Sequence, residues 1–452
     1  MAKAANGPAI EEKVGETKAK KARSTLIRSD LADYQGASNL AFNDKIKNLM
    51  QKGRKIYHFG FGQSPFPVPE VFVKALQKHA DRHEYVTVAG IMELRQKILE
   101  FHKRFDGWTH FDVNHMICGT GSKELIFLIA NVFGGEFLLP SPSWTTYYPQ
   151  TKLAGKPARI IPSNFEDHWF PTPAAIEKAL ENTPKDQHKI LVLNTPNNPT
   201  GQTCSREWLT ETSKVCRKNK ILVLSDEIYG RLAYDGKHES IAQYYPEGTI
   251  VTAGFSKWSS AGGWRAGYAL FPRELSELHS VVASAGTHTF TCCPVPVQHA
   301  LSDGLDQMEG LQQYILHTRR ILDALGNDVC RKLTAEGVRA HPPKGGYYFM
   351  PDFGVCRKGL AKHGIHTGQQ MCDAMLNEAN VALMPAGPYY LRPVDELTTR
   401  FCFVNFDGTA ALKASYAMSL DKPIDQQFLQ KYCKTTLDGV EALVQWMKKY
   451  KE

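Results

Sequence analysis

The 452-residue sequence has no uninterrupted apolar run long enough to cross a bilayer, so we expect no membrane partner. Its ten cysteines form no C-x-x-C pair and follow no regular spacing, which favours a reducing compartment and argues against a zinc module. The N-terminus lacks an apolar signal-peptide core, which disfavours secretion. No internal repeat occurs. These absences favour an ordinary globular protein of the cytoplasm.

The formal net charge of +8 is unevenly distributed along the chain. Residues 1–29 hold seven lysines and arginines against three glutamates, which accounts for half of the excess. Because this segment has few large apolar residues, we predict a disordered basic tail over 1–28, with organellar import left open. The remaining sequence is only mildly basic and shows no nucleic-acid-binding motif, so we expect no nucleic-acid partner.

Three continuous apolar runs, typical of buried parallel strands, lie at 189–194, 221–225 and 249–253. Helical patterns separate them, so this part of the chain is predicted as β-α-β-α-β. Each run leads into polar residues, among them Asn198, Asp226 and Lys257. In open α/β sheets ligands bind outside the carboxyl ends of the strands. The pattern therefore predicts a ligand site at that edge.

Lys257 lies in a run of small residues, and Arg265 follows eight positions later. Small residues let a bulky planar group approach a lysine nitrogen, and the planar fork of arginine matches phosphate oxygens. The pairing suits a lysine that holds pyridoxal phosphate as a Schiff base. A lysine in such a loop is more often a solvated side chain, so this motif needs support from the rest of the chain.

Three other segments are compatible with a flat, phosphorylated ligand. Residues 117–126 resemble a strand, a glycine-rich turn and a helix start, where backbone N–H groups can bind an anion. Trp144 lies in an aromatic cluster after a short strand at 136–140. Gly62 lies in a glycine-proline turn that permits close backbone approach. Each segment alone is also explained as a connection or as core packing.

The pattern changes after residue 335. A helical region runs from 274 to about 336 with an interruption at 289–296, and strands at 345–350 and 399–406 follow with helices between and after. We predict four parts: a tail over 1–28, an N-terminal arm with part of the small domain over 29–76, a large domain over 77–335 and a small α+β domain over 336–452.

Taken in order, these motifs resemble the class I/II aminotransferases, pyridoxal-phosphate enzymes of fold type I, over roughly residues 35–450. The bacterial-type aspartate and prephenate aminotransferase branch is the most similar, on Tyr85 with Ala89-Gly90, Gly121-Ser122-Lys123, Trp144 and Gly263-Trp264-Arg265. The resemblance implies an α/β fold, with a large domain on a mostly parallel seven-stranded sheet and a smaller α+β domain.

The resemblance also implies a role for each motif residue. Lys257 would hold pyridoxal phosphate, Asp226 would pair with the ring nitrogen, and Tyr229 and Asn198 would hydrogen-bond the ring oxygen. Trp144 would stack on the ring. The phosphate would be bound by Gly121, Ser122, Lys123 and Arg265, and by Tyr85 from the neighbouring subunit of a homodimer. Arg400 would bind the substrate α-carboxylate with help from the Gly62 backbone and Asn198.

Two departures from the family pattern stand out. Many members have a serine three residues before the lysine, whereas this chain has Gly254, so phosphate anchoring from that loop is open and Ser256 is a candidate substitute. The segment Tyr389–Pro393 before Arg400 is longer than usual, and we expect it to change the substrate mouth.

The implied activity is ping-pong transfer of an amino group from an L-amino acid, aspartate or a broad range, to a 2-oxo acid. A lyase or synthase on the same scaffold, of the C–S lyase or cyclopropane-carboxylate synthase type, is the alternative. A ligand-sensing regulator is disfavoured because the tail is too short for a helix-turn-helix domain. A dicarboxylate substrate would need a second cation facing Arg400, and no sequence motif marks one.

Overall fold

The computed structural model describes residues 26–32, 34, 36–181, 183–184 and 186–451. The chain forms two compact units, Met1–Gln35 and Gly36–Glu452. In the first, the described residues hold one short 3-10 turn at Ser29–Leu31, and most of the predicted tail lies outside the described residues. Among the described residues, no helix combines the length and apolarity needed to span a bilayer.

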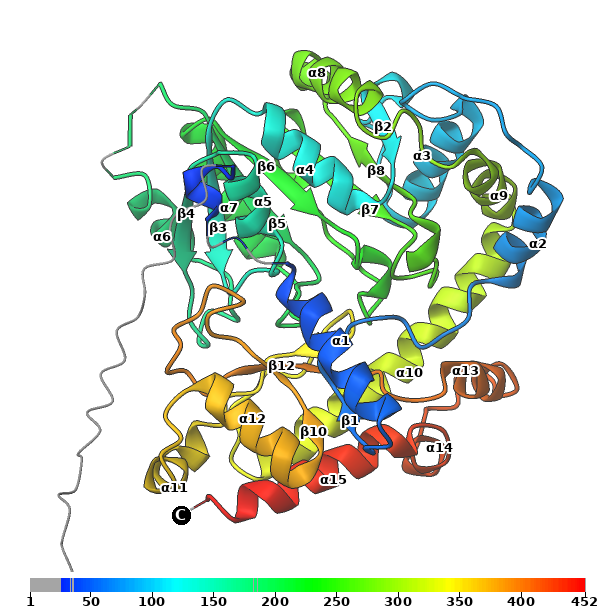
Figure 1. Ribbon diagram of the computed structural model, residues 1–452. Helices are drawn as coiled ribbons and strands as arrows, with labels where there is room; N and C mark the ends of the chain where they lie inside the picture. The colour runs from blue at the N-terminus through cyan, green and yellow to red at the C-terminus, as the bar shows by residue number, and fades with distance from the viewer. Residues whose placement is uncertain (1–25, 33, 35, 182, 185, 452) are drawn as a thin grey trace, which may run out of the picture. The chain divides into compact units, whose positions relative to one another are not determined.

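The core of the second unit is a seven-stranded sheet (Figure 1). Its strands, in the spatial order β2-β8-β7-β6-β5-β3-β4, are β2 (Met116–Gly119), β8 (Gly267–Leu270), β7 (Thr249–Gly254), β6 (Ile221–Asp226), β5 (Lys189–Asn194), β3 (Glu136–Ser141) and β4 (Ala158–Pro162). Strands β7, β6, β5, β3 and β4 pair in parallel, and β8 is antiparallel to both of its neighbours. The predicted mostly parallel sheet of seven strands is confirmed.

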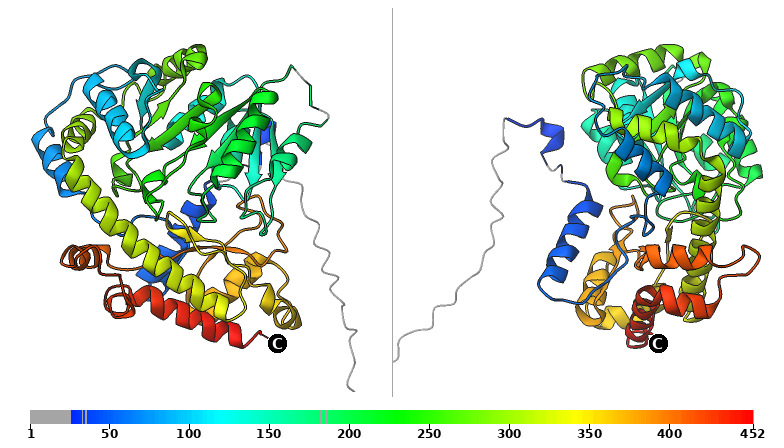
Figure 2. Two further views of the ribbon diagram at one scale, coloured as in Figure 1. Left: turned by 180° about the vertical axis from the view of Figure 1, so that it is seen from behind. Right: turned by 90° about the vertical axis from the view of Figure 1, so that its right-hand side faces the viewer.

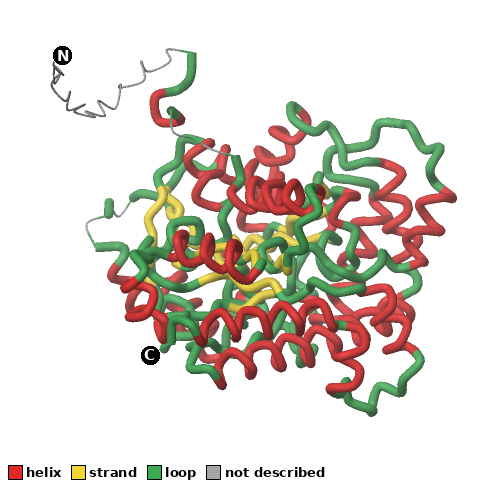
Figure 3. The backbone as a smooth tube through the Cα atoms, turned by 60° about the horizontal axis from the view of Figure 1, so that its bottom comes forward, coloured by secondary structure: helices red, strands yellow, loops and turns green. Residues whose placement is uncertain are grey.

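The strands are apolar on both faces because helices cover both faces. Alternate residues of β5 belong to different cores: Ile190 and Val192 pack in one cluster, and Leu191 and Leu193 in another. The helices of this part of the chain are α2 (Glu70–Lys78), α3 (Met92–Asp106), α4 (Ser122–Val132), α5 (Tyr147–Leu153), α6 (Pro173–Lys178), α7 (Arg206–Lys218), α8 (Ser276–Thr287) and α9 (Val295–Leu305). In Figure 3 the strands lie between layers of helix.

Helix α10 (Met308–Ala335) runs from the sheet toward a second, smaller lobe (Figure 2). The small lobe holds an antiparallel sheet of β11 (Met384–Pro385), β12 (Thr399–Cys402) and β9 (Tyr348–Phe349), and a parallel pair of β1 (Tyr57–His58) and β10 (Val381–Ala382). Its helices are α1 (Ser38–Gln51), α11 (Arg357–Lys362), α12 (Gly368–Ala379), α13 (Gly408–Tyr416), α14 (Gln426–Tyr432) and α15 (Lys434–Lys448).

Both strands predicted for the small lobe exist but are shorter than expected. Of the predicted strand 345–350, only Tyr348–Phe349 forms β9, because Gly346 takes a left-handed φ of +72° and interrupts the extended backbone. The run 399–406 narrows to β12, which ends at Cys402. Strand β1 pairs with β10, so the early chain contributes a strand to this lobe. The division of the chain into four parts, with boundaries at 28, 76 and 335, stays a prediction.

Candidate active site

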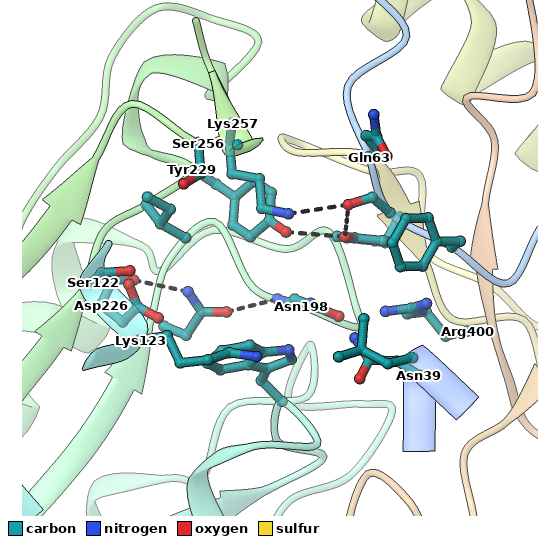
Figure 4. Close-up of a pocket in the computed structure, with 18 of the residues that line it drawn as sticks. Asn39, Gln63, Ser122, Lys123, Asn198, Asp226, Tyr229, Ser256, Lys257 and Arg400 are labelled. Carbon is teal, nitrogen blue, oxygen red and sulfur yellow. Dashed lines mark hydrogen bonds between the residues drawn. The ribbon is translucent and has the colours of Figure 1, made fainter. Parts of the chain in front are cut away.

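A cavity of about 550 Å³ lies at the carboxyl ends of β5, β6 and β7 (Figure 4). Asn194 ends β5, Asp226 ends β6, and Lys257 follows the end of β7 by three residues. Arg400, from β12 of the small lobe, lines the same cavity. The sequence-based expectation that polar residues meet at this sheet edge is confirmed.

The Lys257 amine is poised to react near neutral pH. Its Nζ donates to the carbonyl oxygen of Gly62 at 3.0 Å and lies 5.6 Å from the ring centroid of Tyr229. Burial of the ammonium, together with the positive charge of Arg400, lowers the pKa of Lys257 to about 8. An amine with that pKa spends a useful fraction of time unprotonated, as a nucleophile or a general base requires.

Asp226 is a buried carboxylate that forms no ion pair with any described residue. Its Oδ2 accepts a hydrogen bond from the Tyr147 hydroxyl at 2.6 Å, and its Oδ1 lies 3.5 Å from the Thr252 hydroxyl. None of the ion pairs among the described residues includes Asp226. Burial raises its pKa to about 6, against the opposing effect of the Tyr147 hydrogen bond. A buried carboxyl group of this kind needs a positive partner to ionise fully, and a protonated ring nitrogen would supply one.

The Asn198 side chain is held at the cavity wall with unused hydrogen-bonding capacity. Its backbone N–H donates to Asn194 Oδ1 at 2.8 Å, and Asn194 Nδ2 donates to the carbonyl oxygen of Asp226 at 2.7 Å. Asn198 Oδ1 is buried and has no partner among the described residues. The Tyr229 hydroxyl lies 2.9 Å from the Tyr348 hydroxyl, and burial raises the Tyr229 pKa well above its ordinary value. The donors that these two residues can offer a ring oxygen are the Asn198 amide nitrogen and the Tyr229 hydroxyl, because Asn198 Oδ1 can only accept.

One corner of the cavity has the features of a phosphate site. Ser122 begins α4, whose first backbone N–H groups have no partner within the helix. Gly121 has a φ of +90°, and a side chain there would bring Cβ within 2.3 Å of Arg265 Nη2. The Arg265 guanidinium donates to the carbonyl oxygens of Gly262 at 2.7 Å and Thr120 at 3.0 Å, which holds it against the glycine turn.

A steric constraint explains why position 254 is a glycine. A Cβ at Gly254 would lie 2.8 Å from the Cα of Gly267 and 2.9 Å from the carbonyl oxygen of Ala266, because β7 and β8 pack closely there. No serine fits without moving backbone. Ser256 lines the cavity, so it stays the candidate for the role of the missing serine.

Arg400 is 1% exposed, and its guanidinium lies close to two aromatic rings. The guanidinium carbon lies 4.9 Å from the ring centroid of Tyr348 and 5.5 Å from that of Tyr390. Nη2 donates to the carbonyl oxygen of Gly60, and Nε has no partner among the described residues. No carboxylate pairs with Arg400 within the described part of the chain. A buried arginine in this state matches a ligand carboxylate.

Most residues predicted from the sequence meet at this cavity: Gly62, Ser122, Lys123, Trp144, Asn198, Asp226, Tyr229, Lys257, Arg265 and Arg400 all line it. Gly121 lies beside it against Arg265. Tyr85 is 86% exposed and is not among the lining residues. Sequence reasoning missed Asn39, Gln63, Tyr147 and Tyr348, which also line the cavity. The sequence could have indicated Tyr147, because it follows Trp144 by three residues in the aromatic cluster. No sequence pattern indicated Asn39, Gln63 or Tyr348.

These residues fit pyridoxal phosphate. Asp226 would pair with the ring nitrogen, Asn198 and Tyr229 would hydrogen-bond the ring oxygen, and the N-terminus of α4 beside Arg265 would hold the phosphate. The fit rests on two observations: Asp226 is a buried acid with no ion-pair partner among the described residues, and the N-terminus of α4 lies beside the Arg265 guanidinium.

The family model "Aminotransferase class I and II" matches residues 54–409, so the chain belongs to that family. The protein is a pyridoxal-phosphate-dependent aminotransferase, as the motifs predict, and the lyase alternative is not favoured.

Individual relatives are similar over nearly their whole length. An aspartate aminotransferase of Bacillus sp. (strain YM-2) is 30% identical over 406 residues, which cover 88% of this chain and 96% of the relative. The aspartate/prephenate aminotransferase of Thermus thermophilus is 27% identical, over 77% of this chain and 88% of the relative. The solved Thermus thermophilus aspartate aminotransferase with maleate has a TM-score of 0.77 at 23% identity, covering 93% of this chain and 99% of that one, and supports the fold.

Proposed function

We propose that this enzyme transfers the amino group of an L-amino acid, with aspartate as the first candidate, to a 2-oxo acid in a ping-pong cycle. The observation that carries the proposal is the arrangement of three groups on one cavity. The Lys257 amine, the buried Asp226 carboxyl and the unpaired Arg400 guanidinium all line it.

When bound, pyridoxal phosphate supplies an electron sink that stabilises negative charge at the substrate Cα. In our proposal Asp226 keeps the ring nitrogen protonated, and Tyr147 holds the Asp226 carboxylate in place through its hydrogen bond. Lys257 takes a proton from the substrate Cα, because its pKa of about 8 leaves part of the amine free near neutral pH. Arg400 binds the α-carboxylate and so aims the Cα toward the lysine.

The remaining predicted residues have binding roles in the proposal. Asn198 and Tyr229 donate to the ring oxygen, and Trp144 stacks on the ring. Ser122, Arg265 and the backbone at Gly121 hold the phosphate. The Gly62 carbonyl already accepts from Lys257, so it fixes the amine and borders the substrate carboxylate site.

Lys123 is the candidate second cation for a dicarboxylate. Its ammonium lies 5.1 Å from the ring centroid of Trp144 and lines the cavity that Arg400 lines. Burial and the nearby positive charge of Arg265 lower the pKa of Lys123, and no carboxylate pairs with its ammonium among the described residues. Aspartate as substrate of the named relatives supports this role. Phosphate binding, predicted from the sequence, is the competing role for Lys123.

A single-turnover experiment tests the proposed reaction. Mixed with aspartate alone, the loaded enzyme should release one oxaloacetate per active site and then stop, because no acceptor is present. Added 2-oxoglutarate should restart turnover. A lyase would instead release ammonia continuously without an acceptor, and that result would contradict the proposal.

We also propose a homodimer in which Tyr85 reaches the phosphate corner of the neighbouring subunit. The 86% exposure of this large aromatic side chain supports it. Mass measurement in solution should give twice the chain mass, and Tyr85→Ala should weaken cofactor binding in a dimer that remains intact. We propose the cytoplasm as its compartment, which ten cysteines standing as free thiols support.

A further inference from the structure

The segment Tyr390–Arg392 lies within Tyr389–Pro393, which we predicted from the sequence to be longer than usual, and it crosses from the small lobe to the end of β3. It follows β11 and precedes the strand that carries Arg400. Leu391 takes a left-handed φ of +63°, a conformation that a branched residue keeps only when surrounding contacts enforce it. We call this segment the brace.

On the large-lobe side, the brace is hydrogen-bonded to residues next to Trp144. The backbone N–H of Ser143 donates to the carbonyl oxygen of Tyr390 at 3.1 Å. The Ser141 hydroxyl donates to the carbonyl oxygen of Leu391 at 2.7 Å. Ser143 directly precedes Trp144, so this hydrogen bond fixes the backbone next to the ring that we propose stacks on the cofactor.

Arg392 ties the brace to the large lobe a second time. Its Nη1 donates to the carbonyl oxygens of Ser163 at 3.0 Å and Ser141 at 3.3 Å, and its guanidinium carbon lies 5.0 Å from the ring centroid of Trp169. Nε donates to Glu396 Oε2 at 2.9 Å. The Arg392 side chain is 11% exposed, so these contacts are shielded from water.

On the small-lobe side, the brace leads to Arg400 by two routes. The fully buried Tyr390 ring packs against the Arg400 guanidinium at 5.5 Å. Glu396, held by Arg392, accepts a hydrogen bond from the Thr398 hydroxyl at 3.1 Å, one residue before the strand of Arg400.

We propose that Tyr390 and Arg392 are positioning residues that set the separation between Trp144 and Arg400. One hydrogen-bonded segment holds both the ring that faces the cofactor and the guanidinium that faces the substrate carboxylate. The brace therefore determines how well a bound amino acid is aligned. This inference rests on the role proposed for Arg400.

The test compares two cross-lobe arginines. Arg392→Met removes the ties to Ser141, Ser163 and Glu396 while keeping a chain of similar length. Arg339→Met is the matched control: Arg339 also stacks on a large-lobe aromatic, Phe165, at 4.5 Å, and pairs with Glu166, but it touches no part of the brace. The probe is maleate, an unreactive dicarboxylate, titrated against the loaded enzyme by the absorbance of the bound cofactor.

For Arg392→Met we expect maleate Kd and amino-acid KM to rise about tenfold or more, since small displacements of binding groups cost that much. Cofactor Kd should stay within about twofold. Arg339→Met should leave maleate Kd unchanged. Equal maleate affinity in both variants, with only the melting temperature lowered in Arg392→Met, would overturn the proposal because it would show a purely structural role.

A second pair covers the case in which Arg392→Met does not fold. Tyr390→Leu removes the ring from Arg400, and Tyr390→Phe keeps the ring and loses only the hydroxyl contact to Met384. We expect weakened maleate binding in Tyr390→Leu and its rescue in Tyr390→Phe, and no difference between the two would contradict the brace. Arg400→Met tests the role of Arg400 separately from that of the brace. If this variant binds maleate normally, the proposed role of Arg400 is wrong, and the positioning role of the brace is then wrong as well.

Discussion

The hydrogen bond from Tyr147 to Asp226 gives a sharp prediction, because it joins a buried acid to the proposed cofactor nitrogen. The pKa of about 6 at Asp226 means that ionising it costs about 3 kcal/mol more than ionising an exposed carboxyl group. Cofactor binding needs the ionised form. Cofactor affinity should therefore be full above pH 6 and should fall by up to about tenfold per pH unit below it.

Tyr147→Phe should move the pH below which cofactor affinity falls to a higher value. The lost hydrogen bond favours the charged carboxylate and spans 2.6 Å, so it contributes about 1.5–3 kcal/mol, or about one to two pKa units. At pH 7 the ionised fraction of Asp226 should then fall enough to raise the cofactor Kd about twofold to tenfold. The ring itself is retained and still packs edge-on against Trp144 at 5.2 Å between centroids.

The assay is cofactor titration of the apoenzyme between pH 5 and pH 8.5. Tyr148→Phe is the matched control, since Tyr148 is a neighbouring tyrosine that is 40% exposed and does not contact Asp226. Asp226→Asn should bind the cofactor weakly at every pH and should lose the part of the pH dependence that comes from Asp226. Titration of the cofactor phosphate affects all variants equally. If cofactor affinity begins to fall at the same pH in Tyr147→Phe and in the wild type, the assigned role of this hydrogen bond is wrong.

Three further substitutions give distinct expected results. Arg400→Met should raise the amino-acid KM by about tenfold to a hundredfold through loss of charged hydrogen bonds, with cofactor Kd unchanged; steady-state kinetics and cofactor titration check this. Lys123→Met should weaken aspartate far more than alanine if Lys123 binds the second carboxylate, whereas equal losses with both donors and weaker cofactor binding would assign it to the phosphate. Gly254→Ser should lower the unfolding free energy by about 1–3 kcal/mol, because its Cβ meets the backbone of Gly267 at 2.8 Å, and it should not improve cofactor affinity; a stable, tighter-binding variant would contradict the steric account.

The sequence predicts the central sheet well because its strands carry their own signal. The apolar runs 189–194, 221–225 and 249–253 coincide with β5, β6 and β7, and the polar residues after them meet at one cavity as expected. The roles of Lys257, Asp226 and Arg400 came from the family resemblance, and the cavity geometry is compatible with them.

Other features depend on contacts between distant residues and leave no local pattern. Strand β8 inserts between β2 and β7 in antiparallel orientation, which alternation of apolar residues cannot reveal. Tyr147 and Asp226 are 79 positions apart, and Ser141 and Leu391 are 250 apart. The exclusion of a side chain at Gly254 likewise follows only from the approach of β8.

The central claim is that Lys257 carries the cofactor. Borohydride reduction of the yellow holoenzyme fixes a lysine–cofactor linkage, and peptide mass spectrometry then locates it. The account predicts the added cofactor mass on the peptide that contains Lys257 and its loss in Lys257→Ala. Attachment at another lysine such as Lys123, or a protein that takes up no chromophore when pyridoxal phosphate is supplied, would contradict it.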